Sequence, residues 1–106
     1  QSLVIQYCNL RKIPIFHIPN GGYKSLTARI KSKKEGLKAG VPDLMIPVAK
    51  GNYHGLFIEM KRVKNSKISV QQLKWIELLN KQGYKAIVCY GSSAAIKEIE
   101  EYIKEK

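Results

Sequence analysis

The sequence has few cysteines, no long apolar run, and no repeated or low-complexity segment. Cys8 and Cys89 stand in apolar surroundings without the spacing of a metal-binding motif, so they are interpreted as buried thiols in a reducing compartment. No apolar stretch approaches the roughly 20 residues that a membrane-spanning helix needs, and no signal peptide is evident. At 106 residues, the chain is expected to form one domain over residues 1–106.

Acidic residues are also scarce, and they are unevenly distributed. Eight Asp and Glu residues stand against nineteen Lys and Arg, a formal net charge of +11 at pH 7. Residues 1–76 hold fourteen of the basic residues and three acidic ones, whereas residues 77–106 are neutral. Such a field attracts phosphate backbones. An anionic membrane is the rival partner, but no strongly apolar face lies opposite the lysines, so the composition favours nucleic acid.

Apolar spacing and turn residues predict an α/β domain with elements in the order αβαββαβα. The expected elements are a helix ending near Arg11, a strand over 13–18, a helix over 25–35, strands over 43–48 and 56–62, a helix over 69–82, a strand over 86–90, and a last helix from Ser92 or Ser93. The turn at 49–55 would close a hairpin. The segment 56–90 would form a crossover unit with parallel strands, which gives a mixed sheet flanked by helices.

The helix over 69–82 carries further signals. Ser69 and Gln72 have the spacing of a capping box at its start. Its apolar residues are Leu73, Trp75, Ile76, Leu78 and Leu79. The run 86–90 is wholly apolar, as expected of a strand that is covered on both faces.

Two apolar segments contain charges that are costly to bury without a ligand. Asp43 stands at the head of one predicted strand, and Glu59 and Lys61 stand near the end of the next. Alternation places Glu59 and Lys61 on one face of their strand. Asp43 lies across the hairpin from them, but a register shift of one residue would turn it to the other face, and the sequence leaves this open.

With Asp43 on the same side as Glu59, the two carboxylates offer hard oxygen ligands to Mg²⁺ or Mn²⁺. Such an ion can generate a hydroxide nucleophile and orient a scissile phosphate. Lys61 would orient or deprotonate the attacking water, or stabilise the charge that builds on the phosphorane. The pattern therefore indicates a metal site that acts on a polyanion.

Four blocks stand in order along nearly the whole chain: FHIPNGG at 16–22, GVPDL at 40–44, GLFIEMK at 55–61, and the stretch 69–84 that begins SVQQ. A Pro-Asp and a Glu-x-Lys alone arise often by chance. Together and in this order, the blocks resemble the virus-type replication-repair nuclease (VRR-NUC) domain, a branch of the PD-(D/E)xK nuclease superfamily.

The resemblance implies a restriction-endonuclease-like core and a Mg²⁺- or Mn²⁺-dependent endodeoxyribonuclease. It implies that Asp43 and Glu59 ligate the metal, with the backbone carbonyl of Met60 as a further ligand. Lys61 would be the catalytic lysine, and Gln71 would support the site from its helix.

The chain departs from the family at one position. The family usually carries a glutamate on its first helix, but no acidic residue precedes Glu35 here, and alignment brings that position near Gln1 or Ser2. Either the glutamate lies upstream of Gln1, or it is replaced. A Gln1 in this place would keep the shape and remove a charge from the metal. The number of metal ions, one or two, stays open.

Small stand-alone members of the family resemble homodimeric Holliday-junction resolvases of bacteria and phages. The resemblance therefore implies a homodimer that cuts four-way DNA junctions in the cytoplasm of a bacterial or phage-infected cell. The alternatives are a monomeric flap or nicking nuclease and a catalytically impaired DNA-binding module of the same fold.

A basic surface for the DNA backbone is predicted on the helix over 25–35 and on the segment after Lys61. Its members are Lys24, Arg29, Lys31, Lys33, Lys34, Arg62, Lys64 and Lys67. The alternative is a solvated helix face and loop, but the charge asymmetry favours DNA contact.

Overall fold

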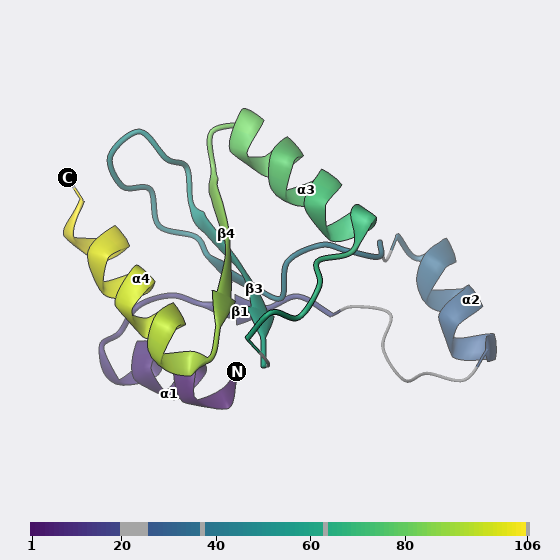
Figure 1. Ribbon diagram of the computed structural model, residues 1–106, viewed down its shortest axis with the longest axis horizontal. Helices are drawn as coiled ribbons and strands as arrows, with labels where there is room; N and C mark the ends of the chain where they lie inside the picture. Colours follow the sequence, from purple (N-terminus) through teal and green to yellow (C-terminus); the bar gives the residue numbers. More distant parts are fainter. Residues whose placement is uncertain (20–25, 37, 63, 106) are drawn as a thin grey trace.

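The computed structural model, which describes residues 1–19, 26–36, 38–62 and 64–105, follows the predicted order of elements (Figure 1). These are α1 (Ser2–Leu10), β1 (Phe16–His17), α2 (Leu26–Lys34), β2 (Leu44–Ile46), β3 (Leu56–Lys61), α3 (Val70–Lys81), β4 (Lys85–Tyr90) and α4 (Ser92–Lys104). The predicted cap at Ser25 and most of the turn at 19–22 lie outside the described residues.

The strands form one mixed sheet in the order β1-β2-β3-β4. β1 pairs with β2 and β2 with β3 in antiparallel fashion, whereas β3 and β4 are parallel. This arrangement confirms the hairpin and the parallel crossover that the sequence predicted. It also leaves β4 at one edge of the sheet, with β1 at the other.

The core lies between the sheet and the pair of helices α1 and α4 (Figure 1). Its buried side chains are Val4, Cys8, Leu44, Ile46, Leu56, Ile58, Cys89, Ala95, Ile99 and Tyr102. The hydroxyl of Tyr102 donates a 2.6 Å hydrogen bond to the carbonyl of Val48, which ties α4 to the chain after β2. Cys8 and Cys89 are both buried free thiols, as predicted.

Helix α3 packs on the opposite face, against β4, and buries none of its residues fully. Of its predicted apolar residues, Trp75, Ile76 and Leu79 are half-buried, whereas Leu73 and Leu78 are exposed. β4 therefore has a helix on each face, as predicted. The capping box is also confirmed, because Ser69 Oγ accepts from the backbone of Gln72 and the Gln72 side chain accepts from the backbone of Ser69.

The first two strands are shorter than predicted. The strand expected over 13–18 is reduced to Phe16 and His17, both exposed, and the strand expected over 43–48 spans Leu44–Ile46. Pro14 and Pro19 bracket β1 and have no backbone N–H to donate, so pairing is limited to the residues between them. None of the helices in the described part of the chain is both long and apolar enough to cross a membrane.

Candidate metal centre

The register of the hairpin brings Asp43 onto the same face as Glu59. Leu44 lies opposite Ile58 in the β2–β3 ladder, so the preceding residue, Asp43, reaches the position across from Glu59. Both side chains are buried, with exposed fractions of 7% for Asp43 and 5% for Glu59. The question that the sequence left open is therefore resolved in favour of a shared face.

The Pro-Asp pair changes the hydrogen bonding at the end of β3. In the same register Met60 would face Pro42, which has no N–H to offer the carbonyl of Met60. The N–H of Met60 donates instead to Asp43 Oδ2, at 2.9 Å. The N–H and C=O of a strand residue point to the same side of the strand. The Met60 carbonyl therefore points to the side on which the Asp43 carboxylate lies, and no N–H group of β2 donates a hydrogen bond to it.

A glutamine from α3 joins Glu59 to Lys61. Gln72 Nε2 donates to Glu59 Oε2 at 3.0 Å, and Lys61 Nζ donates to Gln72 Oε1 at 3.0 Å. Lys61 Nζ also lies 4.0 Å from Glu59 Oε2, and the Lys61 side chain is 17% exposed. The glutamine amide therefore fixes the spacing between the carboxylate and the ammonium group.

The sequence prediction that Gln71 supports the site is corrected to Gln72. Gln71 is exposed and takes no part in this set of hydrogen bonds. As the third residue of the capping box, Gln72 turns its side chain back across the start of α3, toward the end of β3. The Ser-x-x-Gln spacing is visible in the sequence, but on its own it predicts only a helix cap.

Gly40 sets the approach of α3 to the segment before Asp43. It has a φ of +91°, and a Cβ at this position would lie 2.6 Å from the backbone carbon of Gln71. Only glycine fits both the left-handed conformation and this close approach. The contact holds the first turn of α3, and therefore Gln72, beside Asp43 and Glu59.

Burial first, and then the charge of the neighbouring Asp43 and a hydrogen bond with it, raise the pKa of Glu59 to about 7, although the charge of Lys61 acts in the opposite direction. A carboxyl group with this pKa can release its proton and bind a cation near neutral pH.

This raised pKa predicts opposite effects of pH with and without metal. The ordinary value is near 4.5, so the folded carboxyl binds its proton more tightly than the unfolded one. Metal-free protein should therefore lose stability from this group as pH rises through 7. Bound metal requires the ionised form, so the increase in Tm on adding Mg²⁺ or Mn²⁺ should be large near about pH 8 and small near about pH 5.5. A metal-induced shift that is independent of pH would contradict this.

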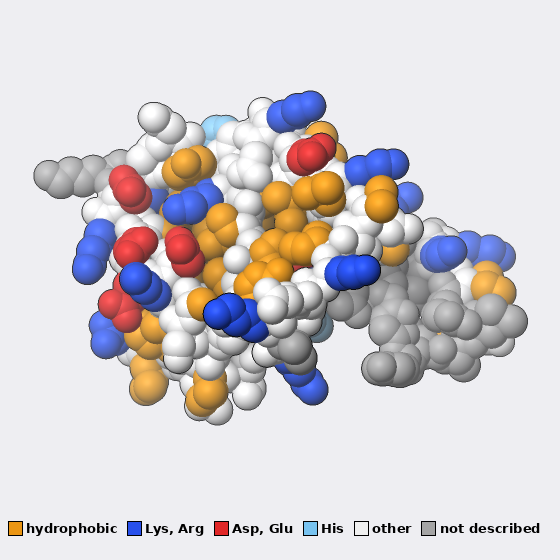
Figure 2. Space-filling model, viewed as in Figure 1, with side chains coloured by type: hydrophobic (Ala, Val, Ile, Leu, Met, Phe, Trp, Pro, Cys, Tyr) orange, Lys and Arg blue, Asp and Glu red, His pale blue; other side chains and the backbone are white. Residues whose placement is uncertain are grey.

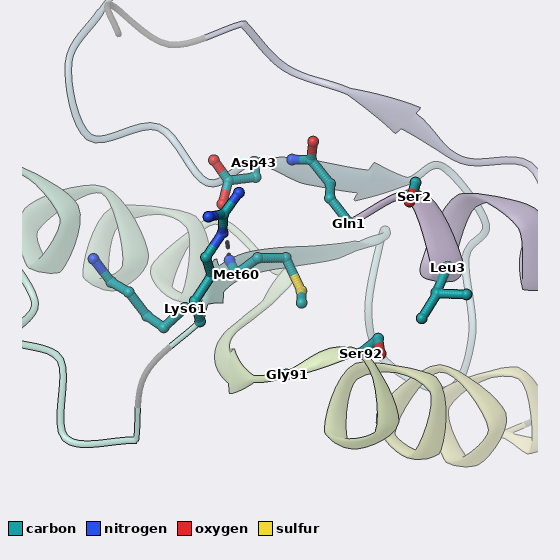
Figure 3. A pocket seen from close by; sticks show the side chains of 9 residues that line it. Gln1, Ser2, Leu3, Asp43, Met60, Lys61, Gly91 and Ser92 are labelled. Carbon is teal, nitrogen blue, oxygen red and sulfur yellow. Dashed lines mark hydrogen bonds between the residues drawn. The ribbon is translucent and has the colours of Figure 1, made fainter.

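Asp43 opens into a cleft of about 550 Å³ at the end of β3 (Figure 3). Its walls are Gln1, Ser2, Leu3, Asp43, Met60, Lys61, Arg62, Gly91 and Ser92. Figure 3 shows the amide of Gln1 directed toward Asp43 across the cleft. The structure therefore brings Gln1, at the start of the first helix, to the side of the predicted metal ligands.

The donor set fits a hard divalent cation with few protein ligands. Among the described residues, no group of three or more His, Cys, Asp and Glu side chains gathers in a way that could hold a metal. The site instead offers Asp43 and Met60, which line the cleft, and Glu59, buried beside Asp43; the two carboxylates and the Met60 carbonyl are all oxygen donors. Mg²⁺ and Mn²⁺ accept such a set, since they retain waters and take further oxygens from a phosphate.

Most described members of the predicted basic surface lie outside the cleft. Lys31, Lys33 and Lys34 are exposed in the last turn of α2, and Arg62, Lys64 and Lys67 are exposed after β3. Tyr90 Oη donates to the carbonyl of Ser66 at 3.2 Å, which anchors this second segment to β4. Lys24 lies outside the described residues, as does the side chain of Arg29. Among the members that the structure describes, Arg62 alone also lines the cleft.

Gln72→Ala should lower any metal-dependent activity of this site by about 10- to 100-fold, because Glu59 and Lys61 lose the amide that spaces them. The variant also loses the capping-box hydrogen bond that the Gln72 side chain accepts from the backbone N–H of Ser69. Ser69→Ala is therefore the matched control, since it removes the cap and leaves the Gln72 amide in place. Activity should fall only in Gln72→Ala, whereas thermal stability should fall in both. Equal activity losses in Gln72→Ala and Gln71→Ala would contradict the assignment.

Comparisons with known proteins agree with the fold. The model of the VRR-NUC domain family matches residues 6–93. A solved structure described as a VRR_NUC domain protein is similar, with a TM-score of 0.85 and 38% sequence identity over 99% of this chain and 85% of that one. No curated protein was found to match the sequence. The matched segment contains Asp43, Glu59, Lys61 and Gln72 on the mixed sheet described above. The chain therefore belongs to the VRR-NUC domain family, whose members are nucleases of the PD-(D/E)xK type.

Proposed function

We propose that the protein is a metal-dependent DNA endonuclease whose active site is the cleft at the end of β3. The observation that carries the proposal is the pairing of Asp43 with Glu59, side by side and buried, next to the Met60 carbonyl and Lys61. Two buried carboxylates without a cation would be costly in a protein that needed only to bind DNA. Membership of a nuclease family supports the same conclusion.

Asp43, Glu59 and the Met60 carbonyl would hold Mg²⁺ or Mn²⁺. When bound, such an ion supplies a hydroxide nucleophile and offsets charge on the phosphate oxygens. Lys61 would orient the attacking water through its ammonium group and stabilise the charge that builds on the phosphorane. Gln72 would keep Lys61 and Glu59 at their spacing while the Glu59 carboxylate is ionised.

The basic segments would deliver the DNA backbone to this cleft. Lys31, Lys33 and Lys34 project on α2, which Figure 1 shows extending away from the sheet, and Arg62 stands at the rim of the cleft. Contacts of this kind position a duplex without reading its sequence. DNA affinity should therefore depend steeply on salt.

The substrate we propose is a four-way DNA junction, cut by a homodimer. The support is the resemblance to small junction resolvases, together with the match between a twofold substrate and a twofold enzyme. Two equivalent sites would cut two equivalent strands. A monomeric flap nuclease on the same scaffold is the enzyme alternative.

Gln1 favours the second alternative, a DNA-binding module with impaired chemistry. It places an amide in the cleft beside Asp43, near the position, at Gln1 or Ser2, to which alignment brings the family's first-helix glutamate. Gln1→Glu should therefore lower the Mg²⁺ or Mn²⁺ concentration needed for half-maximal cleavage, since a further carboxylate would face the metal. Gln6→Glu, an exposed position on the same helix, is the control. If Gln1→Glu needs the same metal concentration for half-maximal cleavage as the wild type, the residue at position 1 does not face the metal.

A supercoiled plasmid with an extruded cruciform tests the substrate proposal. Paired cuts across the junction give linear DNA, whereas a single cut gives a nicked circle. We expect linear product with Mg²⁺ or Mn²⁺ and no cutting of the same plasmid without the cruciform. Nicked circles alone, together with cleavage of a synthetic flap, would support the monomeric alternative. Binding without any cleavage would support the impaired module.

A further inference from the structure

The edge of the sheet at β4 carries main-chain groups that no other strand in the described part of the chain pairs. The N–H groups of Lys85 and Gly91 donate to β3 and its flank, so the odd-numbered residues of β4 face β3. The N–H and C=O groups of Ala86, Val88 and Tyr90 therefore point outward. Unpaired edges of this kind are templates for another strand.

Asn80 closes this edge at one point only. Its side chain accepts from the N–H of Ala86 at 3.0 Å and donates to the carbonyl of the same residue at 3.2 Å. In the described part of the chain, no other group bonds to the outward main chain of Val88 or Tyr90. The open stretch is therefore confined to the second half of β4.

An apolar stripe of α3 flanks the same stretch. Leu73 lies two helical turns before Asn80 and so shares its side of α3, with Ile76 between them. Leu73 is 51% exposed and Tyr90 is 38% exposed. Figure 2, in the view of Figure 1, shows hydrophobic side chains gathered in the middle of this face, between α3 and α4, where Figure 1 shows β4. Exposed apolar groups beside an open strand edge mark an interface.

Charge indicates which partner fits. The protein as a whole repels its own copies at a net charge of +11, but the excess belongs to residues 1–76, whereas 77–106 are neutral. β4 and α4 lie in the neutral part, and Lys85 and Glu98 of these two elements form an ion pair at 3.9 Å. A second copy can therefore approach β4 and α4 with less repulsion than the basic segments would cause, and a polyanion gains less from these two elements than from those segments.

We propose that β4 pairs antiparallel with β4 of a second copy, which extends the sheet across a twofold axis. In the register that uses the outward N–H and C=O groups of the second half of β4, Val88 exchanges hydrogen bonds with Tyr90 of the partner subunit. The main chain of Ala86 keeps its hydrogen bonds to the Asn80 side chain. Leu73 and Ile76 then pack at the rim of the interface. The inference rests on the proposed function only in that it supplies the dimer that paired cutting requires.

Two pairs of variants test this interface by sedimentation equilibrium. Wild-type protein should have twice the 12.0 kDa mass of one chain at micromolar concentration. Leu73→Glu puts a charge at the rim, whereas Leu78→Glu puts one about 140° around the same helix, on an exposed side away from β4. The first should raise the dimer dissociation constant at least about tenfold, and the second should leave it unchanged.

Val88→Pro removes the N–H group that points away from β3 and leaves the hydrogen bonds between β3 and β4 in place. The variant should therefore fold, but its dimer should dissociate. Val88→Thr keeps the donor and should remain dimeric. The circular dichroism spectra of all four variants should match that of the wild type. If Val88→Pro does not fold, the Leu73→Glu and Leu78→Glu pair still decides the question.

Cleavage of the cruciform plasmid separates the two proposals. Leu73→Glu and Val88→Pro should still nick the plasmid but lose the linear product, since each monomer retains its own site. A wild type that is monomeric while it cuts, or a dimer whose dissociation constant neither variant changes, would overturn the interface and leave the nuclease standing. A dimer that cuts nothing, even with metal, would overturn the nuclease and leave the interface standing.

Discussion

Glu59→Gln is expected to abolish metal-dependent cleavage while leaving the fold intact. Glu59 is 5% exposed and shares its face with Asp43, so the amide removes the charge that a divalent ion needs and keeps the shape. We expect a loss on the order of 10³-fold or more, about 4 kcal/mol of transition-state stabilisation. The metal-induced increase in Tm should disappear as well.

The same variant should behave in the opposite way in a stability measurement without metal. Above pH 7 the wild type holds a buried ionised carboxylate that the raised pKa of Glu59 shows to be unfavourable. Glu59→Gln removes that cost, so its Tm should exceed that of the wild type near about pH 8 and approach it at low pH. Glu77→Gln, an exposed position on α3, is the control for loss of a single charge. A variant that is both inactive and less stable at about pH 8 would point to a structural role for the carboxylate.

Lys61→Ala is the second variant for which we expect a large loss of activity, about 10²- to 10⁴-fold. Its Nζ lies 3.0 Å from Gln72 Oε1 and 4.0 Å from Glu59 Oε2, at the wall of the cleft. Unlike Glu59→Gln, it should keep the metal-induced increase in Tm, because the oxygen donors remain. Loss of metal binding together with activity would contradict a role in the chemical step.

Lys61→Arg distinguishes the two roles open to the lysine. The guanidinium keeps the positive charge but does not give up its proton. If Lys61 acts through charge on the phosphorane, the arginine should restore part of the activity lost in the alanine variant. If it deprotonates the water, both variants should be equally inactive. The measurement is the single-turnover cleavage rate at saturating metal.

Most of the fold was predictable because strong local signals agree with the tertiary arrangement. The Ser69–Gln72 capping box, the apolar run of β4 and the glycines of the 49–55 turn each predicted an element that the structure contains. The short β1 was overestimated, because apolar residues at 13–18 indicate burial and not strand pairing. Ile13 and Ile15 do pack against the core, but outside any strand.

The site was predictable in its charges and less so in its geometry. Asp43, Glu59 and Lys61 could be named from their apolar surroundings, but the face of Asp43 depends on a ladder register that no local pattern determines. Choosing Gln72 over Gln71 required the direction of a side chain at the start of α3, which follows from the capping box and from the contact at Gly40. The open edge of β4 followed only from the strand order.

The central claim is that Asp43 and Glu59 hold the ion that cuts DNA, and the most direct measurement is cleavage of an end-labelled four-way junction as Mg²⁺ or Mn²⁺ is titrated. The wild type should cut only with metal, lose cutting when a chelator is added, and regain it with excess metal. Asp43→Asn and Glu59→Gln should bind the junction without cutting it at any metal concentration. Cleavage that persists in either variant, or in the wild type with chelator, would contradict the account.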